Sequence, residues 1–184
     1  IIKYDNCILG HTRLKVIDVT DDANQPMVSP CGNFIIVFNG EIYNYLELRK
    51  KIDVQFKTNS DTEVLLNAYI KWGEKCLHML NGMFAFAIYN RNNNTIFAAR
   101  DPFGIKPFYF FNDKNRFIFG SEIKAILHSG IPREPNYQAI FDFLRWGAID
   151  HNDKTWFKGI HSLLPGHFLK VGMDLQLQQK SYWS

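Results

Sequence analysis

The stretch from which the fold can be predicted reads Val37-Phe38-Asn39-Gly40-Glu41-Ile42-Tyr43-Asn44-Tyr45-Leu46. The run 34–38 is apolar and rich in β-branched and aromatic residues, which is typical of a buried strand. Asn39-Gly40 interrupts this pattern, and Tyr45, Leu48 and Ile52 follow with the spacing of one helix face. Between two strands Asn-Gly would favour a tight hairpin, but a helix follows here. The stretch therefore predicts a strand, a turn permitted by Gly40, and a helix.

This arrangement has a chemical consequence at the predicted end of the strand. The Asn39 amide and the Gly40 N–H can point outward together, and two such donors could stabilise a developing oxyanion. The alternative is a polar loop that only joins two elements.

Composition limits the class of protein. The chain has 184 residues, of which 46% are hydrophobic and 21% charged, so it predicts one folded domain. The net charge is +3 and the cations are interspersed with anions, which does not favour binding to nucleic acid. No apolar run approaches the roughly 20 residues of a membrane helix, and we find no signal peptide.

The spacing of the cysteines does not indicate a functional site. Cys7, Cys31 and Cys76 are an odd number without Cys-x-x-Cys or Cys/His spacing, so they predict neither a disulfide framework nor a zinc site. We interpret them as free thiols in a reducing compartment, the cytoplasm.

Arg13 is unusual for its neighbourhood. It stands in a predicted strand region, 8–19, among Leu14, Val16, Ile17 and Val19. A guanidinium in apolar surroundings needs an anionic partner, which is either a structural carboxylate or the carboxylate of a ligand.

A second helix is predicted to begin near Asp61. Ser60 and Glu63 have the spacing of a capping box, and an apolar face follows until Gly73. Asp61 falls in the first helical turn, where the helix dipole favours negative charge, so its simplest role is to stabilise the helix.

The rest of the chain predicts mostly antiparallel strands. In 83–89 the large residues Phe84, Phe86 and Ile88 alternate with Ala85 and Ala87, so one face meets bulky packing and the other allows close approach. Further strands are predicted at 95–99, 108–111, 116–119, 167–171 and 175–177. Two helices are expected, one capped by Ser121 and ending at Leu127, the other spanning 137–146. The fold class is α+β, a sandwich in which helices cover antiparallel sheets.

Several familiar motifs are missing. The sequence has no Gly-rich dinucleotide motif, no nucleotide P-loop and no Gly-x-Ser-x-Gly nucleophile motif. The six histidines lack the spacing of metal ligands and are interpreted as surface or cap residues. We therefore expect no metal and no cofactor in this domain.

A family resemblance follows from stretches that occur in order along nearly the whole chain. It resembles the glutamine amidotransferase domain of glutamine-hydrolysing asparagine synthetases. The stretches that carry the resemblance are Gly10-His11-Thr12-Arg13-Leu14, Phe38-Asn39-Gly40-Glu41-Ile42-Tyr43-Asn44, Ser60-Asp61-Thr62-Glu63, Leu80-Asn81-Gly82-Met83-Phe84-Ala85-Phe86-Ala87, Arg100-Asp101-Pro102-Phe103-Gly104-Ile105-Lys106-Pro107, Gly120-Ser121-Glu122-Ile123-Lys124-Ala125 and Leu164-Pro165-Gly166.

The resemblance implies an N-terminal-nucleophile hydrolase fold, a four-layer αββα sandwich of two antiparallel sheets covered by helices. It implies hydrolysis of glutamine to glutamate and ammonia, with the ammonia passing to a synthetase domain of the same polypeptide. ATP and Mg²⁺ would serve that domain, whose phosphate loop is not found here. By the same pattern 1–184 is one amidotransferase domain, and 132–184 is its C-terminal part leading to the absent synthetase domain. The resemblance leaves a homodimer open.

Residue roles are also carried over from the resemblance. Arg13 would hold the α-carboxylate of glutamine, and Glu41 and Asp61 its α-amino group. Asn39 and the Gly40 N–H would form the oxyanion hole. The backbone of Leu14, Val16 and Ile17 would line the same pocket.

One departure concerns the nucleophile, which in the family is an N-terminal cysteine. Position 1 is Ile1, and Cys7 precedes the Arg13 motif too closely to replace that cysteine. We expect the nucleophile and the first strands upstream of Ile1, and unpaired sheet edges without them. Two alternatives stay open: the amidotransferase half of a sugar-modifying or antibiotic-forming relative, and a non-catalytic docking domain.

Overall fold

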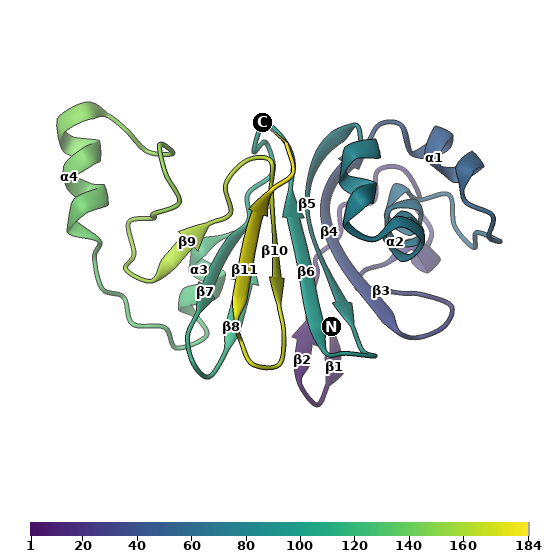
Figure 1. Ribbon diagram of the computed structural model, residues 1–184, viewed down its shortest axis with the longest axis horizontal. Coiled ribbons are helices and arrows are strands. Elements are labelled where there is room, and N and C mark those ends of the chain that lie inside the picture. The colour runs from purple at the N-terminus through teal and green to yellow at the C-terminus, as the bar shows by residue number, and fades with distance from the viewer. Residues whose placement is uncertain (184) are drawn as a thin grey trace.

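The largest element of the fold is a six-stranded antiparallel sheet in the order β11-β10-β6-β5-β4-β3 (Figure 1). The computed structural model describes residues 1–183. The strands of this sheet are β3 (Met27–Val28), β4 (Phe34–Ile42), β5 (Gly82–Asn90), β6 (Thr95–Arg100), β10 (His167–Val171) and β11 (Leu177–Ser181). Because β10 and β11 belong to it, the C-terminal part of the described chain supplies two strands to the same sheet as the central strands.

One face of the large sheet is covered by helices α1 (Tyr45–Lys51) and α2 (Asp61–Trp72). Phe84, Phe86 and Ile88 of β5 pack into the core on this side and are fully buried. A 3-10 helix, Gly73–Met79, follows α2. The bulky face predicted for residues 83–89 is therefore the helix-covered face.

The other face of the sheet carries Ala85 and Ala87, which contact a second β layer through Phe108, Phe110 and other buried residues. This layer consists of a hairpin and a three-stranded sheet in the order β8-β7-β9, and no ladder of the described residues joins the two. Its strands are β1 (Ile2–Tyr4), β2 (Cys7–Leu9), β7 (Tyr109–Asn112), β8 (Phe117–Gly120) and β9 (Ile160–Ser162). The predicted close approach on the alanine face is confirmed.

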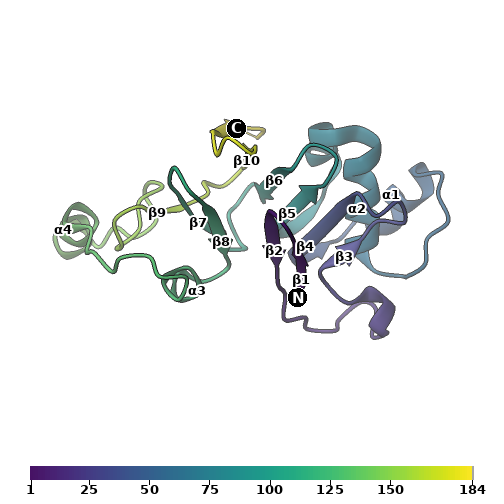
Figure 2. The same cartoon turned by 90° about the horizontal axis from the view of Figure 1, so that it is seen from below.

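Helix α3 (Ile123–Leu127) covers the outside of the three-stranded sheet, where Ile126, Ile131 and Ile160 form a third core. Figure 2 shows α3 on one side of the sheets and α1 and α2 on the other. The order of layers is helix, sheet, sheet, helix. The predicted α+β class and four-layer αββα arrangement are confirmed.

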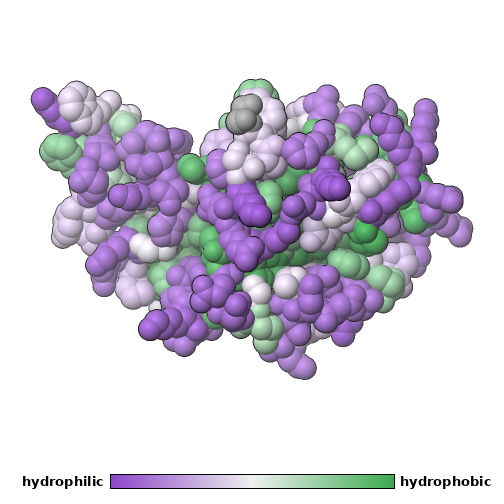
Figure 3. Space-filling view, in the orientation of Figure 1, coloured by the Kyte–Doolittle hydropathy of each residue, from purple (hydrophilic) through white to green (hydrophobic). Residues whose placement is uncertain are grey.

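Helix α4 (Tyr137–Trp146) confirms the helix predicted for 137–146 and extends to one side of the molecule (Figure 1). On the face drawn in Figure 3 hydrophilic side chains predominate, and a band of hydrophobic ones crosses the middle. Among residues 1–183, no helix combines the length and hydropathy needed to span a bilayer.

The turn predicted at Asn39-Gly40 is wrong. Strand β4 continues through both residues to Ile42, and its ladder with β5 pairs Phe34 with Asn90 and Ile42 with Gly82. The turn lies at 43–44, just before α1. The pairing with β5 provides backbone partners that a local Asn-Gly signal does not reveal.

The strand predicted for 8–19 is also wrong beyond Leu9. The segment 10–20 is irregular, and Leu14, Val16 and Val19 are 85%, 64% and 69% exposed. Its apolar residues find no neighbouring strand, and without ladder partners an extended segment does not become part of a sheet.

Smaller differences concern helix caps and one strand end. Ser121 does not cap α3, whose N-cap is Glu122, and β11 begins at Leu177 because Leu175 takes a positive φ of 56° in the preceding turn. The capping box of α2 is half formed. Ser60 Oγ accepts from Glu63 N–H at 3.2 Å, but the Glu63 carboxylate bonds the backbone of Lys57 and Thr58.

Candidate active site

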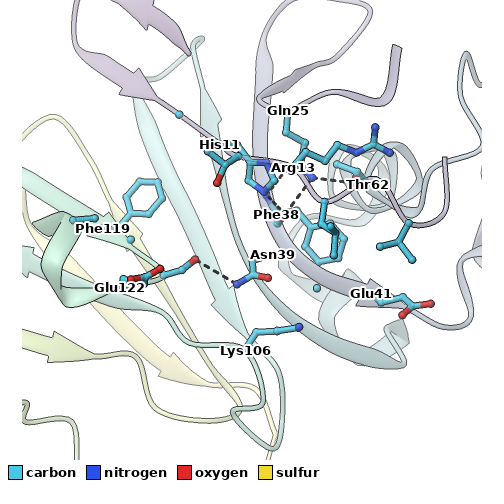
Figure 4. A pocket seen from close by; sticks show the side chains of 18 of the residues that line it. His11, Arg13, Gln25, Phe38, Asn39, Glu41, Thr62, Lys106, Phe119 and Glu122 are labelled. Carbon is cyan, nitrogen blue, oxygen red and sulfur yellow. Dashed lines mark hydrogen bonds between the residues drawn. The ribbon is translucent and has the colours of Figure 1, made fainter. Parts of the chain in front are cut away.

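A cavity of about 850 Å³ opens where β4, the start of α2, the segment 10–17 and the turn after β8 meet (Figure 4). The structure brings every candidate site residue to this one cavity. They are Arg13, Leu14, Val16, Ile17, Asn39, Gly40, Glu41 and Asp61.

The orientation of Gly40 follows from its partner strand. Opposite Gly40 on β5 is Phe84, whose backbone bonds Asp101 on the far side, with N–O distances of 2.7 and 3.2 Å. In an antiparallel pair, residues opposite one another point their backbone groups either toward each other or both away. The Gly40 N–H therefore points to the free edge of β4, beyond the end of the two-residue strand β3, where the cavity lies.

A glycine is required at position 40. A Cβ placed there would lie 2.1 Å from the carbonyl oxygen of Met83, closer than any side chain tolerates. Without a Cβ the two strands approach closely, and the Gly40 N–H stays accessible from the cavity.

The Asn39 side chain lines the same cavity and contacts its other side. Its Nδ2 donates to Ser121 Oγ at 3.4 Å, just before α3. Because strand residues alternate, the Asn39 side chain leaves the sheet face while Gly40 N–H lies along its edge. Two donors thus reach one cavity from consecutive residues.

Asp61 is the most buried ionisable group of the cavity, with 6% of its surface exposed. Its Oδ2 accepts from the Ile42 N–H at 3.0 Å, which ties the start of α2 to the end of β4. Burial raises the pKa of Asp61 above its ordinary value, and the Glu41 carboxylate adds to this, although backbone N–H groups oppose it. Two carboxylates in one cavity favour a cationic ligand group.

The Arg13 guanidinium donates to two backbone carbonyls, those of Asp18 and Thr20. Among residues 1–183 no carboxylate lies within ion-pair distance of it, so the alternative of a structural carboxylate partner is not observed. Half-buried and oriented by two carbonyls, Arg13 remains able to bind an anion.

Asp18 holds the loop of Arg13 and was not among the predicted site residues. Its carboxylate accepts from Thr20 N–H and Oγ1 and, at 2.8 Å, from Asn59 N–H just before α2. These hydrogen bonds, that of the Thr20 hydroxyl first, lower the pKa of Asp18. The Asp-x-Thr spacing, which is typical of a local turn, was an available signal.

His11 also belongs to the cavity, and its interpretation as a surface or cap residue is wrong. Its Nε2 donates to Phe38 O at 3.0 Å, and within the described chain its buried Nδ1 has no partner. Burial lowers the pKa of the imidazole and favours its neutral form. Other cavity residues missed by sequence reasoning include Gln25, Thr62, Lys106 and Ser121.

All three cysteines are free, as predicted, and none lines the cavity. Cys7 and Cys76 are buried, and burial raises their pKa values to about 11 and about 12. Such thiols are poor nucleophiles at neutral pH.

A family model described as "Glutamine amidotransferase domain" matches residues 1–183. The chain belongs to this family. Asn39, Gly40 and Arg13 therefore line one cavity of an amidotransferase domain.

Relatives and solved structures agree with this assignment. The amidotransferase domain is 40% identical over 183 residues to the glutamine-hydrolysing asparagine synthetase 3 of Bacillus subtilis, covering 96% of this chain and 30% of that protein. It is 44% identical over 133 residues to a putative glutamine-hydrolysing asparagine synthetase 2 of Methanocaldococcus jannaschii, covering 65% and 26%. The chain thus spans less than a third of the length of these relatives.

Its fold is similar to that of a glutamine phosphoribosylpyrophosphate amidotransferase from B. subtilis, with a TM-score of 0.58 and 23% identity over 85% of this chain and 31% of that one. The fold is that of the N-terminal-nucleophile hydrolase amidotransferases.

Proposed function

We propose that this domain hydrolyses the side-chain amide of glutamine to glutamate and ammonia. The observation that carries the proposal is the division of the cavity. Asn39 and Gly40 present donors at the end of β4, while Arg13, Glu41 and Asp61 supply one cation and two carboxylates to the same space. A glutamine molecule carries a matching set, namely an amide carbonyl that becomes an oxyanion, a carboxylate and an ammonium.

Arg13 would bind the α-carboxylate of glutamine in place of water, as a planar fork suited to two oxygens. Glu41 and Asp61 would bind the α-ammonium, whose charge offsets the burial of Asp61. Backbone groups of Leu14, Val16 and Ile17 would complete this end. A role for the backbone rather than the side chains is consistent with the exposure of Leu14 and Val16, whose surfaces are 85% and 64% exposed.

In the reaction a thiolate attacks the amide carbon, and the carbonyl oxygen becomes an oxyanion near Asn39 Nδ2 and Gly40 N–H. The C–N bond then breaks, the nitrogen takes a proton and leaves as ammonia, and water hydrolyses the thioester to glutamate. No cysteine within residues 1–183 lines the cavity, so we assign the thiolate to the N-terminal cysteine that the family resemblance implies.

For the whole protein we propose ATP-dependent synthesis of asparagine from aspartate, in the cytoplasm, with Mg²⁺ serving a synthetase domain. The names of the two asparagine synthetases support this proposal. Ammonia released at the cavity would be the nitrogen donor for that domain.

The test is glutamate release from glutamine by the protein expressed from its natural start codon. We expect release that falls sharply in Asn39→Ala, and asparagine formation only when ATP, Mg²⁺ and aspartate are added. A well-folded protein without glutamate release would overturn the enzyme assignment and leave a non-catalytic docking domain. Glutamate release without asparagine would restrict the failure to the acceptor.

A further inference from the structure

Every second residue of β4 points its backbone N–H and C=O to the free edge of the strand, and we call each such position a rung. The hydrogen-bond partner differs from one rung to the next. Ile36 pairs with Met27 of β3, and two residues further along, Phe38 bonds a side chain instead of a strand. Gly40 is the rung that faces the cavity. At Ile42, the next rung, the N–H donates to the Asp61 carboxylate. The open Gly40 rung therefore lies between two rungs that are held by side chains.

The side chain at the Phe38 rung is Gln25. Its Oε1 accepts from Phe38 N–H at 2.6 Å, and its Nε2 donates to Phe38 O at 3.1 Å. A side-chain amide has the same donor and acceptor as a peptide group. Gln25 thus takes the place that a β3 backbone residue would occupy in a longer ladder.

The register explains why a side chain is used here. The pairs Met27–Ile36 and Val28–Ile35, continued by two residues, would put the backbone of residue 25 opposite Phe38. Strand β3 begins only at Met27, so the backbone of residue 25 does not take that place and its side chain does. The Phe38 carbonyl also accepts from His11 Nε2 at 3.0 Å, so two side chains hold one oxygen (Figure 4).

We propose that Gln25, assisted by His11, is a positioning residue that fixes the Phe38 rung and thereby aims Asn39 and the Gly40 N–H at the developing oxyanion. The proposal rests on the proposed glutaminase function. Asn39 and Gly40 follow Phe38 directly, and donors of an oxyanion site must be held to within about 0.5 Å. β5 pairs with β4 from one side only, so without Gln25 the backbone of Phe38 would be held at the free edge by His11 alone, and only Ile42 would keep its bond to Asp61.

Two substitutions of Gln25 distinguish an effect on the alignment of the oxyanion donors from an effect on folding. Gln25→Ala removes both hydrogen bonds to Phe38 and the weaker one that Nε2 donates to Thr62 Oγ1 at 3.4 Å. Gln25→Glu keeps the shape and an acceptor for Phe38 N–H, but an ionised carboxylate places an oxygen against Phe38 O. A protonated glutamic acid regains one donor, so it can pair with both the N–H and the carbonyl of Phe38 as glutamine does. The matched control is Asn24→Ala, since the exposed Asn24 side chain bonds only Asp21 in the same loop.

The experiment measures kcat and KM for glutamine hydrolysis in the full-length protein from pH 5 to 8. We expect kcat to fall about 10- to 100-fold in both Gln25 variants, because a misplaced donor has effects of that size. KM should change less than about threefold, since Gln25 bonds none of the groups assigned to binding glutamine. The ratio of Gln25→Glu to wild-type kcat should rise toward low pH, and Asn24→Ala should match the wild type.

A purely structural role would lower the melting temperature without this pH-dependent ratio. Unchanged kcat in a folded Gln25→Glu protein, with an active wild type, overturns the positioning role and leaves the glutaminase assignment intact. If the wild type itself is inactive, the proposed function fails. The amide NMR resonances of Asn39 and Gly40 then test separately whether Gln25 aligns these residues. Shifts in Gln25→Glu that disappear at low pH support the alignment, and unchanged resonances overturn it.

Discussion

The cavity has two walls that are built differently. The wall formed by β4 carries Asn39 and Gly40 and is paired with β5 over nine residues, with Phe38 3% and Ile42 0% exposed. The wall formed by residues 10–17 carries Arg13 and has no regular structure, and its Leu14 is 85% exposed. One wall is part of the core, and the other lies on its surface.

This difference fits the two tasks that we propose for the walls, which are oxyanion stabilisation and binding of the α-carboxylate. Donors that act on a transition state must be rigid before the substrate arrives, and a paired central strand supplies that rigidity. A group that binds a carboxylate can tolerate adjustment, and a loop tied down by Asp18 and Asn59 is sufficient. We therefore expect changes at Asn39 and Gly40 in the β4 wall to affect kcat, and changes at Arg13 in the loop wall to affect KM.

The largest effect is expected from Asn39→Ala in the full-length protein. Loss of an oxyanion donor should lower kcat about 10²- to 10³-fold with little change in KM. Steady-state glutamate release measures both. Asn92→Ala, in the exposed turn after β5, is the control. A rise in KM with kcat unchanged would place Asn39 in ground-state binding and remove the contrast between the walls.

A smaller effect of a different kind is expected from Arg13→Ala. Loss of a charge-assisted contact to the α-carboxylate should raise KM about 10- to 100-fold, while kcat at saturation changes little. Arg13→Lys keeps the charge but not the fork and should lie between the two. Equal KM values for all three proteins would show that the carboxylate binds elsewhere.

Asp61 predicts a pH dependence of glutamine binding. Burial raises its pKa, and the glutamine ammonium binds only the ionised form, so affinity should weaken as pH falls through that raised pKa, at most about tenfold per pH unit. The stability effect has the opposite sense. A raised folded pKa stabilises the fold at low pH, and that contribution is lost as pH rises through the folded value.

Calorimetric titration of glutamine into wild type and Asp61→Asn tests this. The variant should bind more weakly at neutral pH and show a flatter profile in the acid range. Its free energy of unfolding should also depend less on pH above the ordinary carboxyl pKa. Parallel binding profiles for the two proteins would show that Asp61 is not the source of the pH dependence.

The smallest effect is expected from Leu14→Ser. Because this side chain is 85% exposed and only its backbone is assigned to the site, stability should change by less than about 0.5 kcal/mol and KM by less than about threefold. Phe38→Ala in the opposite wall should destabilise by about 3–5 kcal/mol. Denaturant unfolding of the pair compares the walls directly. Similar losses in both would mean that the loop is as integrated as the strand.

Local patterns in the sequence were predicted well, and contacts between distant segments were not. Alternation of large and small residues in 83–89 predicted which face carries bulky packing and which allows close approach, because periodicity alone determines the faces of a strand. Which face is covered by helices and which by a sheet came from the structure. The resemblance led to Arg13, Asn39 and Asp61, which do lie in one cavity. Gln25 and His11 were missed, since their partner is a backbone oxygen of Phe38, 13 and 27 residues away.

From the sequence came the α+β class, the apolar faces of the strands, the resemblance to the family, and the residues proposed to bind an oxyanion, a carboxylate and an ammonium. The tertiary structure decided where β4 ends, since pairing with β5 carries the strand through Asn39-Gly40 against the local turn signal. It also decided that the Gly40 N–H is left open beside a rung held by Gln25. Strand edges are created by which segments pair and which do not, and pairing between distant segments is not encoded in local periodicity.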